Sequence, residues 1–171
     1  MLSIVGVFVI STLLFSAVDV QQIEEKHEED CTKCRCTPGW DCHFNSYYKY
    51  IPNAMRWIDA EFYCQKLYPS AHLASIHSED ENDFLKKITF KKTNSYPLIW
   101  VGGSDCYKDR SFVWTDGSSW DYQNWRHGEP NNNGGREACL NFNFATAGLW
   151  NDEYCEKMFP FLCKYTTSWP Y

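Results

Sequence analysis

The segment from Glu129 to Asp152 holds a dense set of side-chain oxygen donors. It reads EPNNNGGREACLNFNFATAGLWND. Its Asn, Gly and Pro content predicts a polar loop rather than a helix, and this loop leads into an apolar strand that ends in Trp-Asn-Asp. Carboxylate and amide oxygens are the ligands that Ca²⁺ takes in proteins. The segment is therefore the candidate for a calcium site, and the remaining chain must hold it in place.

Two short helices are predicted ahead of this segment. Asn53 is expected to cap the first, and Pro69 ends it. Its buried stripe recurs at offsets of three, four and three residues, with Trp57, Ala60, Cys64 and Leu67 on one face. Ser78 and Glu81 form a capping-box pattern that predicts the second helix over residues 79–89. Because the first stripe carries a cysteine, we expect that cysteine to be bridged to the core.

Apolar and aromatic runs predict the strands. Residues 38–51 are typical of a hairpin or edge strand, and residues 72–76 of a short apolar connection. The run 98–101 is continuous and is followed by Gly102-Gly103, a pattern that predicts a central strand ending at a turn. The run 159–164 predicts a last strand that contains a cysteine.

The first twenty residues, 1–20, are predicted to be a secretory signal peptide. They contain no acid before Asp19, and the small residues Ser16 and Ala17 stand near their end. A membrane anchor is the alternative, but the run is interrupted at Gly6, falls short of a full span and is followed by acids. We therefore expect a secreted, extracellular protein without a membrane span.

Length and composition limit the remaining possibilities. A chain of 171 residues has room for one domain of ordinary size. Its eight Trp, eleven Tyr and eleven Phe predict a compact fold in which bulky rings replace long secondary structure. A formal charge of -6 argues against nucleic acid as a partner, because such a partner selects a basic face.

Nine cysteines behind a signal peptide predict a disulfide framework. Because nine is odd, at least one thiol is free, bound to a small molecule or paired with another chain, and a covalent homodimer is one outcome. Residues 21–35 form an acidic spacer in which Cys31 and Cys34 lie close together. Zinc is disfavoured there because no His or second Cys pair follows at finger spacing. We expect the interchain disulfide at Cys31 or Cys34.

The ordered motifs of residues 36–165 resemble those of a C-type lectin-like domain. The matching elements are the Trp57, Ala60, Glu61, Cys64 helix, the HLASI stretch, Ile99-Trp100-Val101-Gly102-Gly103, the WTDG turn, Glu129-Pro130-Asn131, Trp150-Asn151-Asp152 and Phe161-Leu162-Cys163. The resemblance implies an α+β fold with two helices, small antiparallel sheets and a long ligand-binding loop region, stapled by disulfides. It leaves residues 166–171 as a tail. Within the family, the chain is most similar to the secreted single-domain lectins of fish, a group that includes mucus lectins and type II antifreeze proteins.

The resemblance also implies two disulfides. Cys64 pairs with Cys163, and Cys139 pairs with Cys155; each bridge typically contributes about 2 to 4 kcal/mol by restricting the unfolded chain. Long-form relatives have a further pair, and Cys36 fits its first half. The second half would fall near Tyr47, where this chain offers Cys42 instead. The resemblance therefore leaves five cysteines without an assigned partner: Cys31, Cys34, Cys36, Cys42 and Cys106.

The sugar-site calcium of the family takes its ligands from a Glu-Pro-Asn tripeptide, a later Glu and the Asn-Asp of Trp-Asn-Asp. This sequence supplies the whole set: Glu129, Asn131, Glu137, Asn151 and Asp152. The family uses a cis peptide before Pro130, which turns the flanking side chains to one side of the loop. A second calcium site is not expected, because Asn132 stands where the family has an acid.

The same resemblance implies how a sugar would bind. Two vicinal hydroxyls contact calcium, accept hydrogen bonds from Asn131 and Asn151 and donate to Glu129 and Glu137. The order Glu then Asn is similar to family members that select mannose, N-acetylglucosamine or fucose. Galactose or lactose is the alternative, since neighbours such as Arg136 can add contacts. Binding without calcium also stays open.

Three other functions compete with sugar binding. Glu129 and Glu137 could form a glycosidase pair, but the metal pattern uses both and no Ser-His-Asp arrangement is evident, so we expect no enzyme. Ice binding is an alternative, although the Thr residues follow no period. Recognition of a protein partner conflicts with an intact ligand set. We therefore expect a disulfide-linked homodimer that agglutinates glycan-coated microbes or cells in innate defence.

Overall fold

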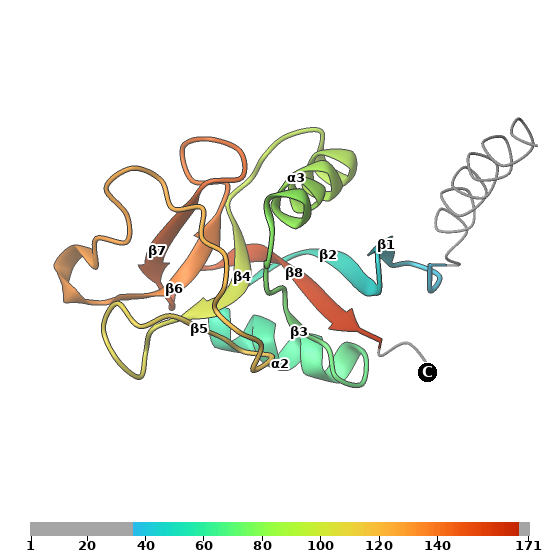
Figure 1. Ribbon diagram of the computed structural model, residues 1–171, viewed down its shortest axis with the longest axis horizontal. Coiled ribbons are helices and arrows are strands. Elements are labelled where there is room, and N and C mark those ends of the chain that lie inside the picture. Colours follow the sequence, from blue (N-terminus) through green and yellow to red (C-terminus); the bar gives the residue numbers. More distant parts are fainter. Residues whose placement is uncertain (1–35, 168–171) are drawn as a thin grey trace, which may run out of the picture. The chain divides into compact units, whose positions relative to one another are not determined.

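The computed structural model describes residues 36–167 of the chain (Figure 1). The predicted signal peptide, the spacer with Cys31 and Cys34, and tail residues 168–171 lie outside the described residues. Within residues 36–167, no helix is both long enough and apolar enough to cross a membrane.

Two helices and eight strands make up the regular structure of the described residues. The elements are β1 (Asp41–His43), β2 (Ser46–Met55), α2 (Trp57–Leu67), β3 (His72–Leu73), α3 (Glu79–Thr93), β4 (Ile99–Ser104), β5 (Val113–Trp114), the 3-10 turn η1 (Asn133–Gly135), β6 (Glu137–Phe142), β7 (Trp150–Tyr154) and β8 (Phe159–Thr166). The α+β class is confirmed. Strand β8 includes Thr166, one residue beyond the expected domain boundary at residue 165.

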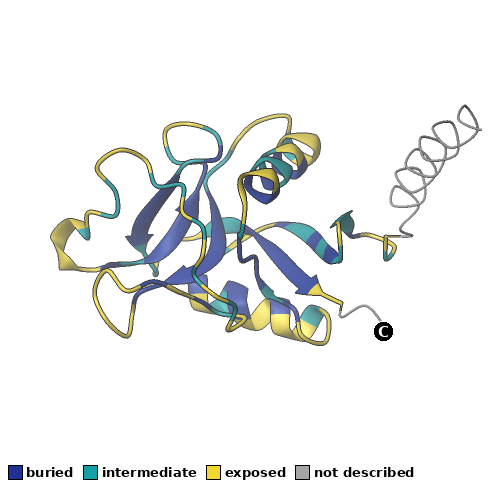
Figure 2. Ribbon diagram, in the orientation of Figure 1, coloured by how far each residue is buried: buried dark blue, intermediate teal, exposed yellow. Residues whose placement is uncertain are grey.

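The strands form one mixed sheet rather than separate small sheets. Its path is β1-β2-β8-β4-β6-β7, with β3 added on β8 and β5 on β4. Every pair is antiparallel except β4 with β8, which meet in a parallel contact between Trp100 and Phe161. This contact joins strands β1, β2 and β8 to strands β4, β6 and β7, and the candidate loop is attached to the last two. Strands β4, β6 and β7 are mostly buried, whereas β1 is half-buried and most connecting loops are exposed (Figure 2).

Helix α2 begins later than the sequence predicts. Asn53 does not cap it, because that residue lies inside β2, which pairs with β8 as far as Met55. The helix starts at Trp57, whose N–H donates to the Cys155 carbonyl at 3.0 Å. Strand pairing therefore overrides the local capping signal. Its end at Leu67 precedes Pro69, as predicted.

Helix α3 begins as predicted but runs further. The Ser78 hydroxyl oxygen accepts the Glu81 N–H at 3.1 Å, which confirms the N-cap. The helix continues past residue 89 to Thr93, so the Lys-rich segment is helical. Lys91 and Lys92 both contact Asp41, at 2.8 and 3.1 Å, and cations near a helix C-terminus are favourable.

The two glycines predicted to end the central strand lie inside it. Strand β4 extends through Gly102 and Gly103 to Ser104. A Cβ on Gly102 would stand 2.5 Å from the Leu73 carbonyl oxygen and 2.9 Å from Thr115 Oγ1. Gly102 therefore allows β4 to pack closely against Leu73 and Thr115. The prediction of a turn at this position is wrong.

Three disulfides staple the described residues. Cys64–Cys163 ties α2 to β8, and Cys139–Cys155 ties β6 to the turn after β7; these are the pairs that the resemblance implies. The third bridge, Cys36–Cys42, pairs two of the cysteines left unassigned above. Among residues 36–167, Cys106 is the one free cysteine, and it is exposed.

The close approach at β4 predicts the effect of one added methyl group. Gly102→Ala should lower the free energy of unfolding by about 3 kcal/mol, because the Leu73 carbonyl is backbone and cannot move aside cheaply. Urea unfolding measures this change. The control Val113→Ala, at an exposed position of β5, should stay within about 0.5 kcal/mol. A Gly102→Ala protein as stable as the control would contradict the packing argument.

Candidate functional site

Strand β7 is the last strand on the sheet path, and the candidate loop covers its free edge. Trp150 accepts the Arg126 N–H at 2.9 Å through its carbonyl and donates its own N–H to Asn124 O at 3.0 Å. Two residues further along β7, the side chain of Asp152 rather than the backbone accepts the hydrogen bonds. It accepts the N–H of Asn131 at 3.0 Å and that of Asn132 at 2.7 Å. Residues 124–126 and 131–132 are thus anchored to β7 at Trp150 and at Asp152.

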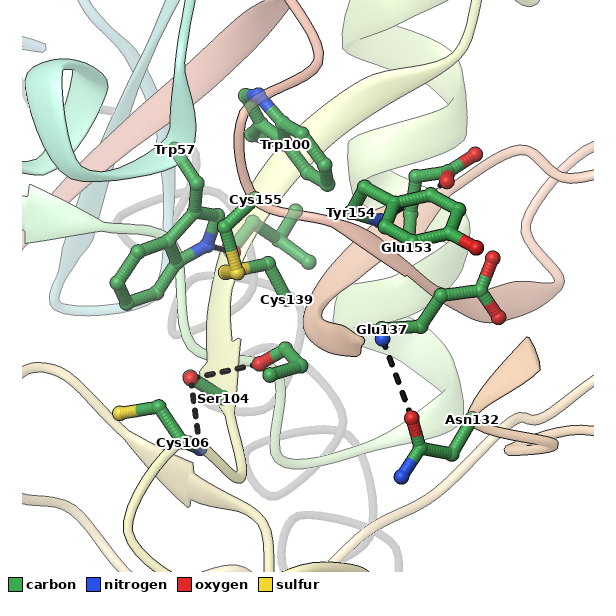
Figure 3. The surroundings of a disulfide bond; sticks show 12 residues. Trp57, Trp100, Ser104, Cys106, Asn132, Glu137, Cys139, Glu153, Tyr154 and Cys155 are labelled. Atoms are coloured by element: carbon green, nitrogen blue, oxygen red, sulfur yellow. Dashed lines mark hydrogen bonds between the residues drawn. A yellow bond between two sulfur atoms is a disulfide. The ribbon is translucent and has the colours of Figure 1, made fainter. Parts of the chain in front are cut away.

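Asn132 ties the loop to two further segments. Its backbone is left-handed, with φ 46°, and its side-chain amide donates to Asp109 Oδ1 at 2.7 Å. Its amide oxygen accepts the N–H of Glu137 at 3.2 Å, as drawn in Figure 3. A single amide therefore connects the 105–112 loop, the candidate loop and the start of β6.

Glu137 and Tyr154 stand opposite each other on β6 and β7 and close the other side of the loop. Asn133 donates its N–H to Glu137 Oε2 at 2.8 Å, and its carbonyl accepts the Tyr154 hydroxyl at 3.0 Å. Figure 3 shows these two side chains next to the Cys139–Cys155 bridge, which joins β6 to the turn after β7. The turn η1 is therefore held by groups from both strands.

The remaining predicted residues differ in exposure. Glu129 is half-buried and precedes Pro130 through a cis peptide bond. Its Oε2 atom is buried and has no hydrogen-bond partner. Asn131 is exposed, whereas Asn151 is buried and donates its side-chain amide to the carbonyl of Asp152. The structure thus brings the loop residues and the β7 residues to one place.

Burial and neighbouring carboxylates raise the pKa of two glutamates at this place. Burial raises the pKa of Glu129, and the charge of Asp152 raises it further. Burial also raises the pKa of Glu137; the Asn133 N–H opposes this, while the charges of Asp152, Glu153 and Glu129 add to it. The ionised form of each group is therefore disfavoured here, and a nearby cation would relieve the repulsion.

The donor set fits a hard cation in two respects. The repelling carboxylates and the partnerless Oε2 of Glu129 are groups that a bound cation would satisfy. Over residues 36–167, no three His, Cys, Asp or Glu side chains already converge closely enough to hold a metal. The set predicted from the sequence has two amides in it, and both Asp152 oxygens are engaged by loop N–H groups. The carboxylates therefore lie around the loop, but they do not surround one common metal position.

The sequence profile of the Lectin C-type domain matches residues 53–165. This chain belongs to the C-type lectin domain family. A protein named Lectin from Pleurodeles waltl is 74% identical over 151 residues, covering 88% of this chain and 85% of the relative. Ladderlectin of Oncorhynchus mykiss is 41% identical over 126 residues, covering 74% of this chain and 65% of that protein. The structure of herring type II antifreeze protein is similar, with a TM-score of 0.71 and 29% identity, covering 78% of this chain and all of the herring chain.

Membership in the C-type lectin family confirms the predicted family and its coarse function. The family is carbohydrate-binding rather than enzymatic, and its domains generally bind Ca²⁺. Two residues that organise this lectin's loop, Asp109 and Tyr154, were not predicted from the sequence. Neither belongs to the motifs on which the resemblance rests. Asp109 acts where the 105–112 loop meets Asn132, and Tyr154 acts from β7 on the Asn133 carbonyl.

The raised pKa of Glu129 predicts a pH-dependent stability without metal. A carboxyl with a raised native pKa stabilises the fold below its ordinary value of 4.5, and this contribution is lost as pH rises through the native pKa. In chelator at pH 7, Glu129→Gln should therefore raise Tm, by about 2 °C. At pH 3.5, where both side chains are neutral, the variant should match the wild type.

Thermal unfolding followed by circular dichroism measures this difference. The control Glu156→Gln removes an exposed carboxylate outside the site and should leave Tm within error at both pH values. A Glu129→Gln variant that is less stable than the wild type at pH 7 would refute carboxylate repulsion.

Proposed function

We propose that this protein is a secreted lectin that recognises vicinal hydroxyls of a sugar through one Ca²⁺ ion. The ligands of the ion would be Glu129, Asn131, Glu137, Asn151 and Asp152. The observation that carries the proposal is the partnerless, buried Oε2 of Glu129, beside the Asp152 carboxylate that anchors the loop. Membership in a carbohydrate-binding family supports it.

The chemistry of the donor set suits this role. When bound, Ca²⁺ would supply a hard centre that accepts two neutral hydroxyl oxygens beside the protein ligands. The side-chain amides of Asn131 and Asn151 can donate to those oxygens. Glu129 and Glu137 can accept the hydroxyl protons. The three carboxylates of the set also explain why the ion would compete with protons for this site.

The order of Glu129 and Asn131 favours sugars of the mannose, N-acetylglucosamine or fucose type. Which side of the site accepts a proton and which donates one decides the geometry of the paired hydroxyls. A galactose- or lactose-binding lectin is the alternative. It draws on Arg136, which is exposed on the same loop and can contact a bound sugar beyond its two hydroxyls.

Exchanging donor and acceptor tests the tripeptide directly. Glu129→Gln combined with Asn131→Asp should move calcium-dependent binding from mannose-type glycans to galactose-type glycans. A glycan array, read with calcium and with chelator, measures the component that the chelator abolishes. The pair Glu156→Gln with Asn53→Asp makes the same chemical changes at exposed positions and should leave the preference unchanged. An unaltered preference in the first pair would exclude the proposed recognition.

We further propose that the protein acts as a disulfide-linked homodimer that agglutinates microbes or cells in innate defence. A single site typically binds one sugar with a Kd of about 1 mM, so useful avidity needs several linked sites. The three disulfides of residues 36–167 agree with an extracellular, oxidising environment. They leave Cys106 as the unpaired cysteine of that range, with Cys31 and Cys34 as the proposed interchain pair.

Replacing the spacer cysteines tests the dimer. Cys31→Ser with Cys34→Ser should run as a monomer on a non-reducing gel and should need at least about 10-fold more protein to agglutinate glycan-coated cells. Cys106→Ser is the matched control and should keep both the dimer and the titre. Equal agglutination by the monomer would contradict the role of the dimer. A monomer produced by Cys106→Ser alone would place the bridge at the exposed loop cysteine instead.

Ice binding is the alternative function of this fold, because the similar herring protein carries an antifreeze name. Such an activity needs a flat, regular surface. The Thr residues of this chain have no regular spacing, whereas the full set of oxygen donors is present. Sugar binding is therefore the function that the residues favour.

A further inference from the structure

A hollow of about 620 Å³ opens beside β2, β3, β8 and the start of α3, elements labelled in Figure 1. Its lining includes Tyr48, Ser75, Glu81, Asp116 and Lys164. It shares no residue with the 129–137 loop or with β7. On the sheet path, β4 and β6 lie between β8 and β7, so the hollow and the candidate calcium site occupy different parts of the sheet.

A buried ion pair forms the floor of this hollow. Lys164, 5% exposed, donates to Glu81 Oε1 at 2.6 Å and to the carbonyl and hydroxyl oxygens of Ser75 at 3.1 Å each. The Tyr48 hydroxyl donates to the same Glu81 oxygen. A buried ion pair is weak evidence for stability, since apolar residues of similar volume often serve as well. Its position under an open hollow points to a role in holding a ligand.

The rim carries a second chain of polar contacts. Ser75 donates its hydroxyl proton to Asp116 Oδ2 at 2.5 Å. His77 contacts Ser75 Oγ through Nε2 at 3.1 Å and Asp121 through Nδ1 at 2.8 Å. The order Ser, His, Asp is that of a hydrolase triad, but the Ser75 proton faces a carboxylate and its oxygen faces Lys164. Ser75 is thus not an activated nucleophile, and the arrangement suits binding.

The charges of the hollow restrict its ligand. Burial alone would raise the pKa of Asp116, but hydrogen bonds from Ser118 and Ser75 and the charge of Lys164 outweigh it, and the pKa lies below its ordinary value. Asp116 is therefore an ionised acceptor at neutral pH. Burial lowers the pKa of His43, which leaves that side chain neutral, and its Nε2 has no hydrogen-bond partner. Because Glu81 neutralises Lys164, the hollow repels anions.

We propose that this hollow is a second saccharide site, which takes a neutral mono- or disaccharide without calcium. Its volume lies in the range of about 300 to 1,000 Å³ that is usual for small-ligand sites. A sugar hydroxyl can donate to Asp116 Oδ2, which otherwise accepts from Ser75. Another can accept from the one hydroxyl of the Ser46–Thr166 pair, 3.0 Å apart, that does not donate to its partner. Phe44, 67% exposed at the rim, offers an aromatic face to the apolar side of a sugar ring. The proposal goes beyond the calcium-dependent function and stands without it.

Chemical-shift titration in EDTA tests the second site. The probes are methyl α-mannoside and lactose, each added to about 20 mM because single sugar sites bind near about 1 mM. We expect saturable shifts of lining residues, and at least a 10-fold loss of affinity in Asp116→Asn. That substitution keeps one oxygen, which can still accept the N–H and hydroxyl of Ser118, whereas the amide nitrogen in place of Oδ2 cannot accept from Ser75. Ser118→Ala is a second variant at the same rim and should weaken binding less.

Matched variants separate this proposal from the calcium site. Asp83→Asn removes a half-buried carboxylate of α3, paired with Lys86 outside the hollow, and should bind both probes like the wild type. Glu129→Gln should lose the chelator-sensitive binding and keep the binding in EDTA, whereas Asp116→Asn should do the reverse. No saturable shift with either sugar in EDTA, or unchanged affinity in Asp116→Asn, would overturn the proposal. Shifts produced by spermidine and not by either sugar would instead identify the hollow as a polyamine site.

Discussion

The contact between the Asp152 carboxylate and the N–H groups of Asn131 and Asn132 fixes the relation between loop and sheet. Asp152 is 1% exposed, and its two oxygens are engaged by consecutive amides of the loop. Asn131 is exposed and Asn132 half-buried, so water is the alternative partner for those amides, and the Asp152 carboxylate replaces it. A strand edge with unpaired groups is otherwise open to other chains, and here the loop covers it. The loop is therefore held in place by hydrogen bonds to one acidic side chain rather than by an apolar core of its own.

This anchoring concentrates negative charge. Asp152, Glu129 and Glu137 come together because the loop crosses β7 and returns to β6, and the same crossing raises the pKa of the two glutamates. The disulfide opposes this repulsion, since Cys139–Cys155 joins β6 to the turn directly after β7, and the Tyr154 hydroxyl holds the η1 turn through the Asn133 carbonyl. The site thus has rigid support beneath groups that are individually unfavourable, a combination expected where binding supplies the compensating energy.

Local signals in the sequence predicted most elements of this fold. The Ser78 cap, the buried stripe of α2 and the apolar runs of β4 and β8 have the positions that their patterns indicate. The errors occurred where distant contacts decide the backbone. Asn53 has a capping side chain, yet pairing of β2 with β8 keeps it extended. Gly102 resembles a turn residue, yet the approach of the Leu73 carbonyl requires a residue without Cβ.

The candidate site divides in the same way between local and long-range information. Its ligand set could be written from the family motifs, because the tripeptide and Trp-Asn-Asp are each contiguous. The hydrogen bonds of Asn132 to Asp109 and of Tyr154 to Asn133 could not, since they join segments about twenty residues apart whose meeting depends on the loop path. Lys164 is a stronger example of a contact that local sequence does not predict. It follows Cys163 in an apolar strand, and no local pattern predicts its burial. Its partner Glu81 is 83 residues away. A lysine placed in a core strand costs desolvation unless a carboxylate is fixed opposite it, so the cap of α3 has two functions. Glu81 accepts the His77 N–H through one oxygen and Lys164 through the other, and the start of the helix thereby sets the charge balance of the hollow.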